Sequence, residues 1–152
     1  MSIEIGELNV RRSIWINASP ERVWNEFESY ERMSAWFGTG HKLTKYEPRV
    51  GGMVETDAGS GEEHERPLLF SGRITVFDPS HELTFESDWL GAGWSAPALI
   101  TIRLTPSKAG TFVELFHHGF ERLGVDAGEM HRGFEGGWTI RQLEALRQIV
   151  EA

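Results

Sequence analysis

Short segments in which apolar and polar residues alternate run through most of the chain. The first contains four apolar residues of one parity and is interrupted at Arg12: Leu8, Val10, Ile14 and Ile16. A period of two is typical of a strand with one buried face. Alternation and strand-forming composition between turn signals predict six further strands, at residues 41–46, 52–56, 68–77, 83–89, 98–104 and 111–118.

Two short helices are expected between the first and second strands. Ser19-Pro20-Glu21 has the residue types of an N-cap and the first two helical positions. The serine hydroxyl accepts a hydrogen bond from a backbone amide that has no partner within the helix, and proline already has the φ angle of a helix. The glutamate carboxylate lies near the positive end of the helix dipole. A second helix is expected over residues 30–37, closed by Gly38.

The last third of the chain predicts a long helix, from about residue 126 to residue 151. At 100° per residue two apolar stripes fall on nearly opposite faces, the first formed by Met130, Phe134, Gly137 and Trp138, the second by Leu143, Leu146 and Val150. One extra residue between Trp138 and Leu143 would align the stripes. We therefore predict a π-turn or kink there. The alternative is a straight helix that is buried on two sides.

The order strand, two helices, six strands and long helix predicts an α+β helix-grip fold. In this architecture a curved antiparallel sheet of about seven strands wraps around the C-terminal helix. The 152 residues are expected to form one domain, residues 1–152, since no composition shift or linker divides them.

Composition narrows the classes of partner and compartment. The net charge of −8 repels phosphate backbones, so no nucleic acid partner is expected. No run approaches the roughly 18 apolar residues of a membrane span, and residues 1–20 do not resemble a secretory signal. The absence of cysteine fits a reducing compartment. We therefore expect a cytoplasmic protein.

A helix that carries Trp138 across a curved sheet predicts an apolar chamber between the two. His117 has the parity of Val113 and Leu115, so it should face this chamber, where it could serve as acid, base or ligand anchor, or simply bond a backbone carbonyl. His118 should point outward into solvent. The candidate ligand-binding residues are Trp36, Phe37, Phe70, Trp89, Trp94, His117, Phe134 and Trp138. The alternative is that most of these rings simply fill the core, which is the preferred interpretation for Phe70, Phe85 and Phe134.

The sequence shows no other arrangement of residues that is typical of a catalytic or metal site. No serine–histidine–acid set appears, and Glu62, Glu63 and Glu65 are most simply solvated loop residues. His41, Glu55, His117 and His131 lack the spacing of ligands within one element. No metal or other cofactor is expected.

Three aromatic residues should lie on the outer face of the sheet: Trp15, Phe112 and Phe116. If the first and last strands are neighbours, the three rings cluster, and an exposed aromatic cluster marks an interface. The hypothesis is a homodimer or partner-docking surface. The alternative is that the rings lie flat under long polar neighbours.

Several motifs in order resemble the START-like (SRPBCC) superfamily, in particular homologues of the activator of the heat-shock-protein-90 ATPase. The resemblance rests on INASPERVW at residues 16–24, Val50-Gly51-Gly52, Gly72-Arg73-Ile74, Asp78-Pro79, Leu83-Thr84-Phe85, Gly110-Thr111, His117, Gly119-Phe120, His131 and Gly137-Trp138. Such proteins usually have a leucine four residues after the tryptophan, where this chain has Gln142.

The resemblance implies three functions. The first is binding of a small apolar or amphipathic molecule between the sheet and the Trp138 helix. The second is a protein-interaction module of the chaperone-regulator or stress-response type. The third is a cyclase- or hydrolase-like enzyme with His117 as base. A fold by itself does not choose between these functions.

Overall fold

The computed structural model describes residues 4–39, 42–57, 69–90, 94 and 96–152. For residues 124–126, 129, 133 and 135–137 the description covers the backbone only. His41, the loop glutamates 62, 63 and 65, and most of the 57–65 and 91–94 loops therefore lie outside the described residues.

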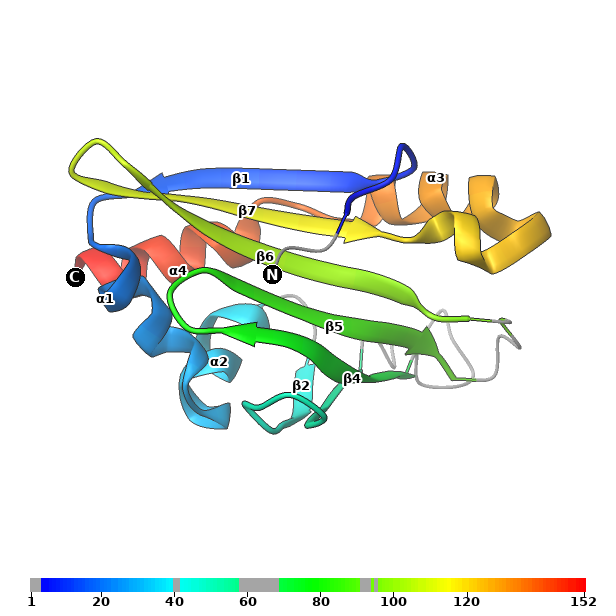
Figure 1. The fold of residues 1–152 in the computed structure, drawn as a ribbon, viewed down its shortest axis with the longest axis horizontal. Helices are drawn as coiled ribbons and strands as arrows, with labels where there is room; N and C mark the ends of the chain where they lie inside the picture. The colour runs from blue at the N-terminus through cyan, green and yellow to red at the C-terminus, as the bar shows by residue number, and fades with distance from the viewer. Residues whose placement is uncertain (1–3, 40–41, 58–68, 91–93, 95) are drawn as a thin grey trace.

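Seven strands form one antiparallel sheet in the order β1-β7-β6-β5-β4-β3-β2 (Figure 1). The α+β helix-grip fold expected from the sequence is confirmed. β1 and β2 form the two edges, because the connection from β1 to β2 runs through the two short helices and the chain then returns through consecutive hairpins. The strands are β1 (Val10–Ile16), β2 (Lys42–Tyr46), β3 (Met53–Asp57), β4 (Leu69–Asp78), β5 (Glu82–Trp89), β6 (Ala98–Ser107) and β7 (Gly110–His118).

The two short helices begin where their capping residues predict. Ser19 is extended, and its Oγ accepts from the Arg22 amide at 3.2 Å, so α1 (Pro20–Trp24) begins with a capped turn and continues as the 3₁₀ helix η1 (Asn25–Phe27). Ser29 caps α2 (Tyr30–Phe37) by the same contact to the Arg32 amide. In the described part of the chain no helix is both long and apolar enough to cross a membrane.

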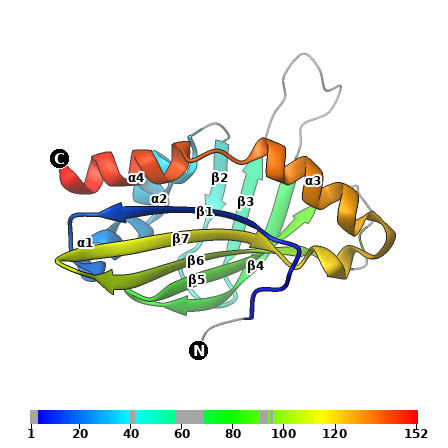
Figure 2. The ribbon, with the colours of Figure 1, turned by 90° about the horizontal axis from the view of Figure 1, so that it is seen from above.

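The C-terminal segment is two helices, so the prediction of one continuous helix from residue 126 to residue 151 is wrong. After the 3₁₀ helix η2 (Phe120–Asp126), α3 (Ala127–Gly137) ends, and α4 (Arg141–Glu151) begins after three non-helical residues. The irregularity expected after Trp138 is confirmed, although it is a break and not a π-turn. Figure 2 shows α3 and α4 end to end on one side of the sheet.

Arg12 accounts for part of this break. Its Nη2 donates to the Trp138 carbonyl oxygen at 3.0 Å, which satisfies a carbonyl that the ended helix leaves free. The residue that interrupts the alternation of β1 therefore ties the edge strand to the helix junction. On the far side of the junction Gln142 is buried, and its Nε2 donates to the Thr39 carbonyl at 2.9 Å. At the position where the resemblance implies an apolar leucine, the chain thus has a hydrogen bond to the segment that follows α2.

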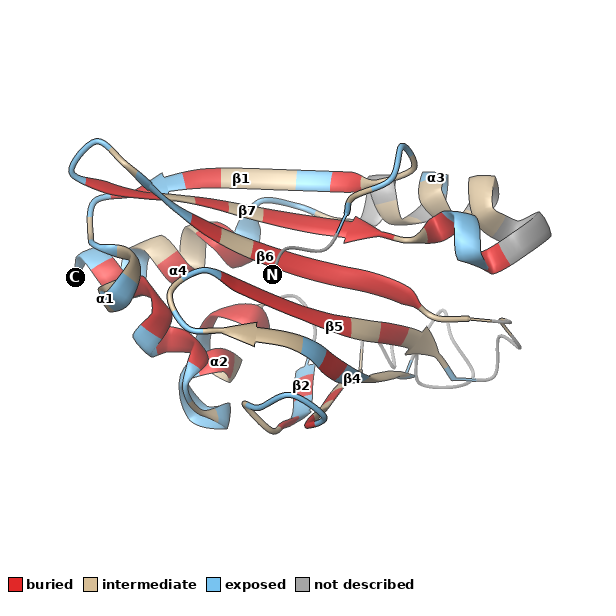
Figure 3. Cartoon of the chain, in the orientation of Figure 1, coloured by how far each residue is buried: buried red, intermediate tan, exposed pale blue. Residues whose placement is uncertain are grey.

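The main core lies between the sheet and α1, α2 and α4. In Figure 3 buried positions concentrate in β5, β6 and β7 and in these helices, whereas the described positions of α3 are intermediate or exposed. A second, smaller cluster lies under α3, where Val10, Ala98, Phe120 and Leu123 are buried and larger residues are only partly covered. Trp138 packs against both clusters. The sheet is thus filled on one half and loosely covered on the other.

Gly72 in β4 generates the first prediction. A Cβ at this position would collide with the Glu86 carbonyl of β5, so only glycine allows this approach of the two strands. We expect Gly72→Ala to lower the free energy of unfolding by about 1–3 kcal/mol, the usual cost of overpacking.

Gly128→Ala is the matched control, since a Cβ there meets only the Arg132 guanidinium at 3.5 Å. It should leave stability unchanged or raise it by up to about 1 kcal/mol, because alanine favours helix. Urea denaturation of both variants measures the difference, and equal effects would contradict the steric argument.

Candidate functional site

The eight candidate residues form one continuous row of rings, here called the aromatic row. Neighbouring ring centroids along it are 4.3 to 6.5 Å apart. The row starts in α2, passes the helix junction, β7, α3, β4 and β5, and ends at Trp94, which follows β5. In order it contains Trp36, Phe37, Trp138, His117, Phe134, Phe70, Trp89 and Trp94. Residues far apart in the sequence are thus brought together on the helix-facing side of the sheet.

The two halves of the row differ in burial. Trp36 is 0% exposed, its Nε1 donates to the Glu26 carbonyl at 3.1 Å, and its ring packs on Phe27 and Phe37. Trp36 and Phe37 are therefore core residues. Five rings at the other end are only half-buried, although they are large and apolar: Phe70, Trp89, Trp94, Phe134 and Trp138. These five are the rings that a bound molecule could contact.

His117 lies in the middle of the row and is 2% exposed. The Trp138 Nε1–H donates to its Nδ1 at 2.8 Å. An indole nitrogen is only a donor, so Nδ1 must carry the lone pair and the proton of the neutral ring must be on Nε2. Nε2 is buried and finds no hydrogen-bond partner among the described residues. The tryptophan thus sets the tautomer of the histidine.

The surroundings keep this imidazole neutral. Burial, with a smaller contribution from neighbouring His118, lowers the pKa of His117 to about 3. A general base needs a free lone pair and a pKa near the working pH. Nδ1 is occupied by Trp138 and Nε2 carries the proton, so His117 in this arrangement is suited to donate a hydrogen bond and not to remove a proton.

His118 corrects a prediction. Its side chain is on the outer face, as parity indicated, but it is 1% exposed and not solvated. Its Nε2 lies 2.8 Å from Thr101 Oγ1, which lies 2.9 Å from Thr84 Oγ1, and burial lowers the pKa of His118 to about 4. The parity of a strand shows which face a residue occupies but not what packs on that face.

The three outer-face aromatics lie on one face as expected, but Phe116 is buried and Phe112 is partly buried. Phe112 is opposite Trp15, and Phe116 is opposite Arg11. The guanidinium groups of Arg11 and Arg103 lie 6.0 and 5.6 Å from the Phe116 ring centroid, and Phe116 is 8% exposed. Trp15 is 39% exposed. The exposed part of this surface is therefore narrower than the sequence suggested, and its role as an interface stays a prediction.

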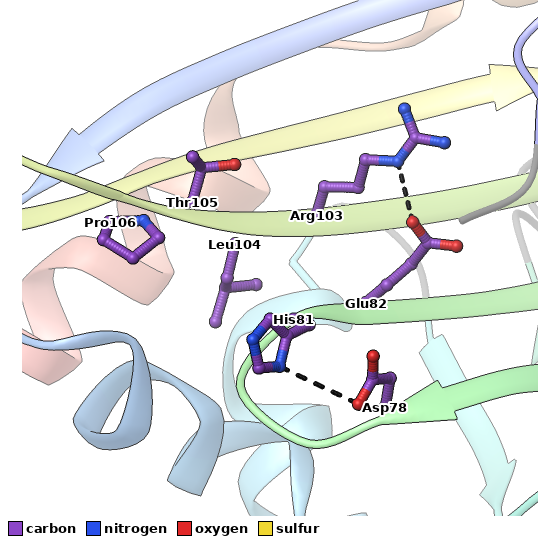
Figure 4. Close-up of a pocket in the computed structure, with 7 residues that line it drawn as sticks. All are labelled: Asp78, His81, Glu82, Arg103, Leu104, Thr105 and Pro106. Atoms are coloured by element: carbon purple, nitrogen blue, oxygen red, sulfur yellow. Dashed lines mark hydrogen bonds and ion pairs between the residues drawn. The ribbon is translucent and has the colours of Figure 1, made fainter. Parts of the chain in front are cut away.

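A pocket of about 340 Å³ opens on the outer face near the turn between β4 and β5. Its lining consists of Asp78, His81, Glu82, Arg103, Leu104, Thr105 and Pro106 (Figure 4). Glu82 accepts from Arg103 Nε at 2.8 Å, and Asp78 lies 3.8 Å from the ring nitrogen of His81. No member of the aromatic row lines this pocket, so it is separate from the candidate site.

Phe120 is a site residue that sequence reasoning missed. Its ring is fully buried, lies 4.9 Å from the His117 ring and stacks with Phe134 at 5.7 Å. The Gly119-Phe120 step in the family resemblance was its only signal, because the residue follows the last strand and belongs to no periodic segment. Among the described residues no three histidine, aspartate or glutamate side chains gather as metal ligands would.

The lowered pKa of His117 generates a prediction for stability against pH. Because about 3 lies below the ordinary histidine value, the unfolded chain binds the proton first as pH falls. The free energy of unfolding should therefore decrease below about pH 6.5. Between pH 6.5 and pH 5 the free energy of unfolding of the natural protein should fall by about 2 kcal/mol more than that of the His117→Gln variant. Denaturation at both pH values tests this, and parallel losses would contradict a neutral buried imidazole.

Comparison with known proteins fits this architecture. The family model described as "Activator of Hsp90 ATPase homolog 1-like protein" matches residues 17–151. No curated protein matches the chain. Similar solved structures include protein CV1439 from Chromobacterium violaceum, with 21% identity, a TM-score of 0.68, and coverage of 97% of this chain and 99% of that one.

Two further structures are similar over most of their length. Protein MLL2253 from Mesorhizobium loti has 19% identity and a TM-score of 0.70 and covers 94% and 96% of the two chains. The Aha1 dimer from Colwellia psychrerythraea has 16% identity, a TM-score of 0.68 and the same coverage. At these identities the structures show the common fold. The family match over residues 17–151 shows that the chain belongs to the family of activator of Hsp90 ATPase homolog 1-like proteins.

Proposed function

We propose that this protein binds a small apolar or amphipathic molecule between the sheet and the α3–Trp138 segment. The observation that supports the proposal is the half-buried end of the aromatic row. Five large rings remain partly accessible beside a core in which Trp24, Phe27, Trp36, Phe37 and Phe85 are buried. A molecule placed against them would remove apolar surface from water, at about 25 cal/mol per Å².

The polarity of the surroundings favours a mainly apolar ligand. Phe134, Phe120 and Trp138 surround the His117 ring, which supplies a single buried polar group. Small-molecule sites commonly combine an apolar lining with few polar groups that orient the ligand. The enzyme alternative with His117 as base has less support, since both ring nitrogens are unsuited to accept a proton. A cytoplasmic location is part of the proposal and rests on the absence of cysteine.

Substitution of Trp89 tests the site. Trp89→Ala removes one ring of the half-buried group, so it should weaken binding of an apolar naphthalene probe about tenfold, which corresponds to roughly 55 Å² of lost apolar contact. Trp15→Ala is the matched control, because it removes a partly exposed tryptophan from the outer face. Fluorescence titration gives the dissociation constants. Equal affinities in the two variants, or no binding to the natural protein, would contradict the proposal.

A second proposal is a homodimer formed through the outer face around Trp15. The Colwellia structure is named as a dimer, and Trp15 is a large ring left 39% exposed on an edge strand. An exposed aromatic ring at a strand edge is a common interface element. A docked partner protein at the same surface is the alternative, in line with the chaperone-regulator or stress-response hypothesis.

Sedimentation tests the homodimer. The natural protein and Val50→Glu should sediment as dimers, because Val50 is exposed in the distant turn between β2 and β3. Trp15→Glu should sediment as a monomer, since a carboxylate would be buried without a partner at the interface. A natural protein that stays monomeric at high concentration would exclude this proposal.

A further inference from the structure

The most informative feature of the site is one unpartnered atom. The Nε2 atom of His117 is buried and has no hydrogen-bond partner among the described residues. The Trp138 indole occupies Nδ1 at 2.8 Å, so Nε2 carries the proton of the neutral ring. A buried N–H without an acceptor destabilises a protein unless a bound group satisfies it. The fold thus maintains a preset donor in the middle of the aromatic row.

The rings around His117 indicate where an acceptor would enter. Phe120 is fully buried, and Trp138 is held to the imidazole by its own hydrogen bond. Phe134 lies closest, at 4.3 Å between ring centroids, and it is only half-buried on α3. Of the three rings, Phe134 is therefore the one that a ligand can displace with least loss of packing.

The charge environment selects the kind of acceptor. None of the three rings that pack on His117 belongs to a charged residue, and the imidazole itself is neutral. A carboxylate brought here would lose its hydration, and none of the three rings that contact His117 carries a positive charge to compensate. A neutral carbonyl oxygen loses less and accepts one hydrogen bond.

We propose that His117 Nε2–H donates to a neutral carbonyl oxygen, of a ketone or ester, on an otherwise apolar ligand that takes the place of the Phe134 ring. This inference rests on the proposed binding function and adds the chemical class of the ligand. The role of His117 is to determine specificity, and that of Trp138 is to position it by holding the tautomer.

A matched pair of probes tests the proposal. 2-Acetylnaphthalene and 2-isopropenylnaphthalene have nearly the same shape and differ in whether oxygen or a methylene group stands at the double bond. The natural protein should bind the ketone about fivefold more tightly than the alkene, as expected for one neutral hydrogen bond. It should bind 2-naphthoate more weakly than the ketone at pH 7. Equal affinities for ketone and alkene would overturn the inference.

Two histidine variants test whether His117 causes the preference for the ketone. His117→Phe should bind both probes with equal affinity. His131→Phe is the control and should keep the preference, because His131 packs on Phe120 but its Nε2 is already paired with the Asn9 carbonyl at 2.9 Å. A ketone preference that survives in His117→Phe would overturn the inference.

Nitrogen NMR of the natural protein needs no variant. The His117 ring should show a protonated Nε2 and an unprotonated Nδ1, and the Nε2 proton should shift on addition of the ketone but not of the alkene. A protonated Nδ1, or identical shifts with the two probes, would overturn the inference. If neither probe binds, the proposed function itself fails. If both bind equally, only the carbonyl assignment fails.

Discussion

The contact on which the site depends is the hydrogen bond from Trp138 to His117. It joins the junction between α3 and α4 to the last strand of the sheet, and it is partly buried among aromatic rings. Arg12 holds the same junction from the edge strand through the Trp138 carbonyl. The indole of Trp138 is thus held by β7, and its backbone carbonyl is held by β1. The position of α3, the tautomer of His117 and the division of the core all follow from this arrangement.

Because the core is divided into two clusters, α3 and α4 differ in how they pack on the sheet. α4 packs on α2 and β1 and completes a closed hydrophobic core. α3 lies over the other half of the sheet with its rings half-covered, and Trp138 packs against the clusters on both sides. One half of the sheet therefore supplies stability and the other leaves apolar surface accessible. The break between the helices permits this division, since a single rigid helix could not follow both halves of a curved sheet with one apolar stripe.

The outer face of the sheet is stabilised by polar contacts. Its aromatic rings lie under arginine side chains, and a row of hydrogen-bonded groups, Thr84, Thr101 and His118, crosses three strands. Such a row satisfies buried polar groups, which are costly when unpaired. The polar groups of this row are thus satisfied, and Trp15 Nε1 donates to the Ser107 carbonyl oxygen at 3.0 Å, whereas the His117 Nε2–H on the helix-facing side has no partner among the described residues.

The sequence by itself determined the seven strands, the capped helices and the family, because these depend on local periodicity, capping chemistry and turn residues. It also named all eight members of the aromatic row, because large rings in a chain of this size gather in the core or line a site. The misaligned stripes around Trp138 and Leu143 indicated an irregular helix, although periodicity cannot distinguish a π-turn from a break.

Only the tertiary structure decided which rings fill the core and which remain accessible, that His118 is buried on the outer face, and what Arg12 does at its inward position. These outcomes depend on contacts between separate elements, such as the contact of Arg12 with Trp138, which lies 126 positions further along the chain and is reached only once the sheet has curled. The tautomer of His117 belongs to the same class. It is set by a donor on another element, and no pattern within the strand carries that information.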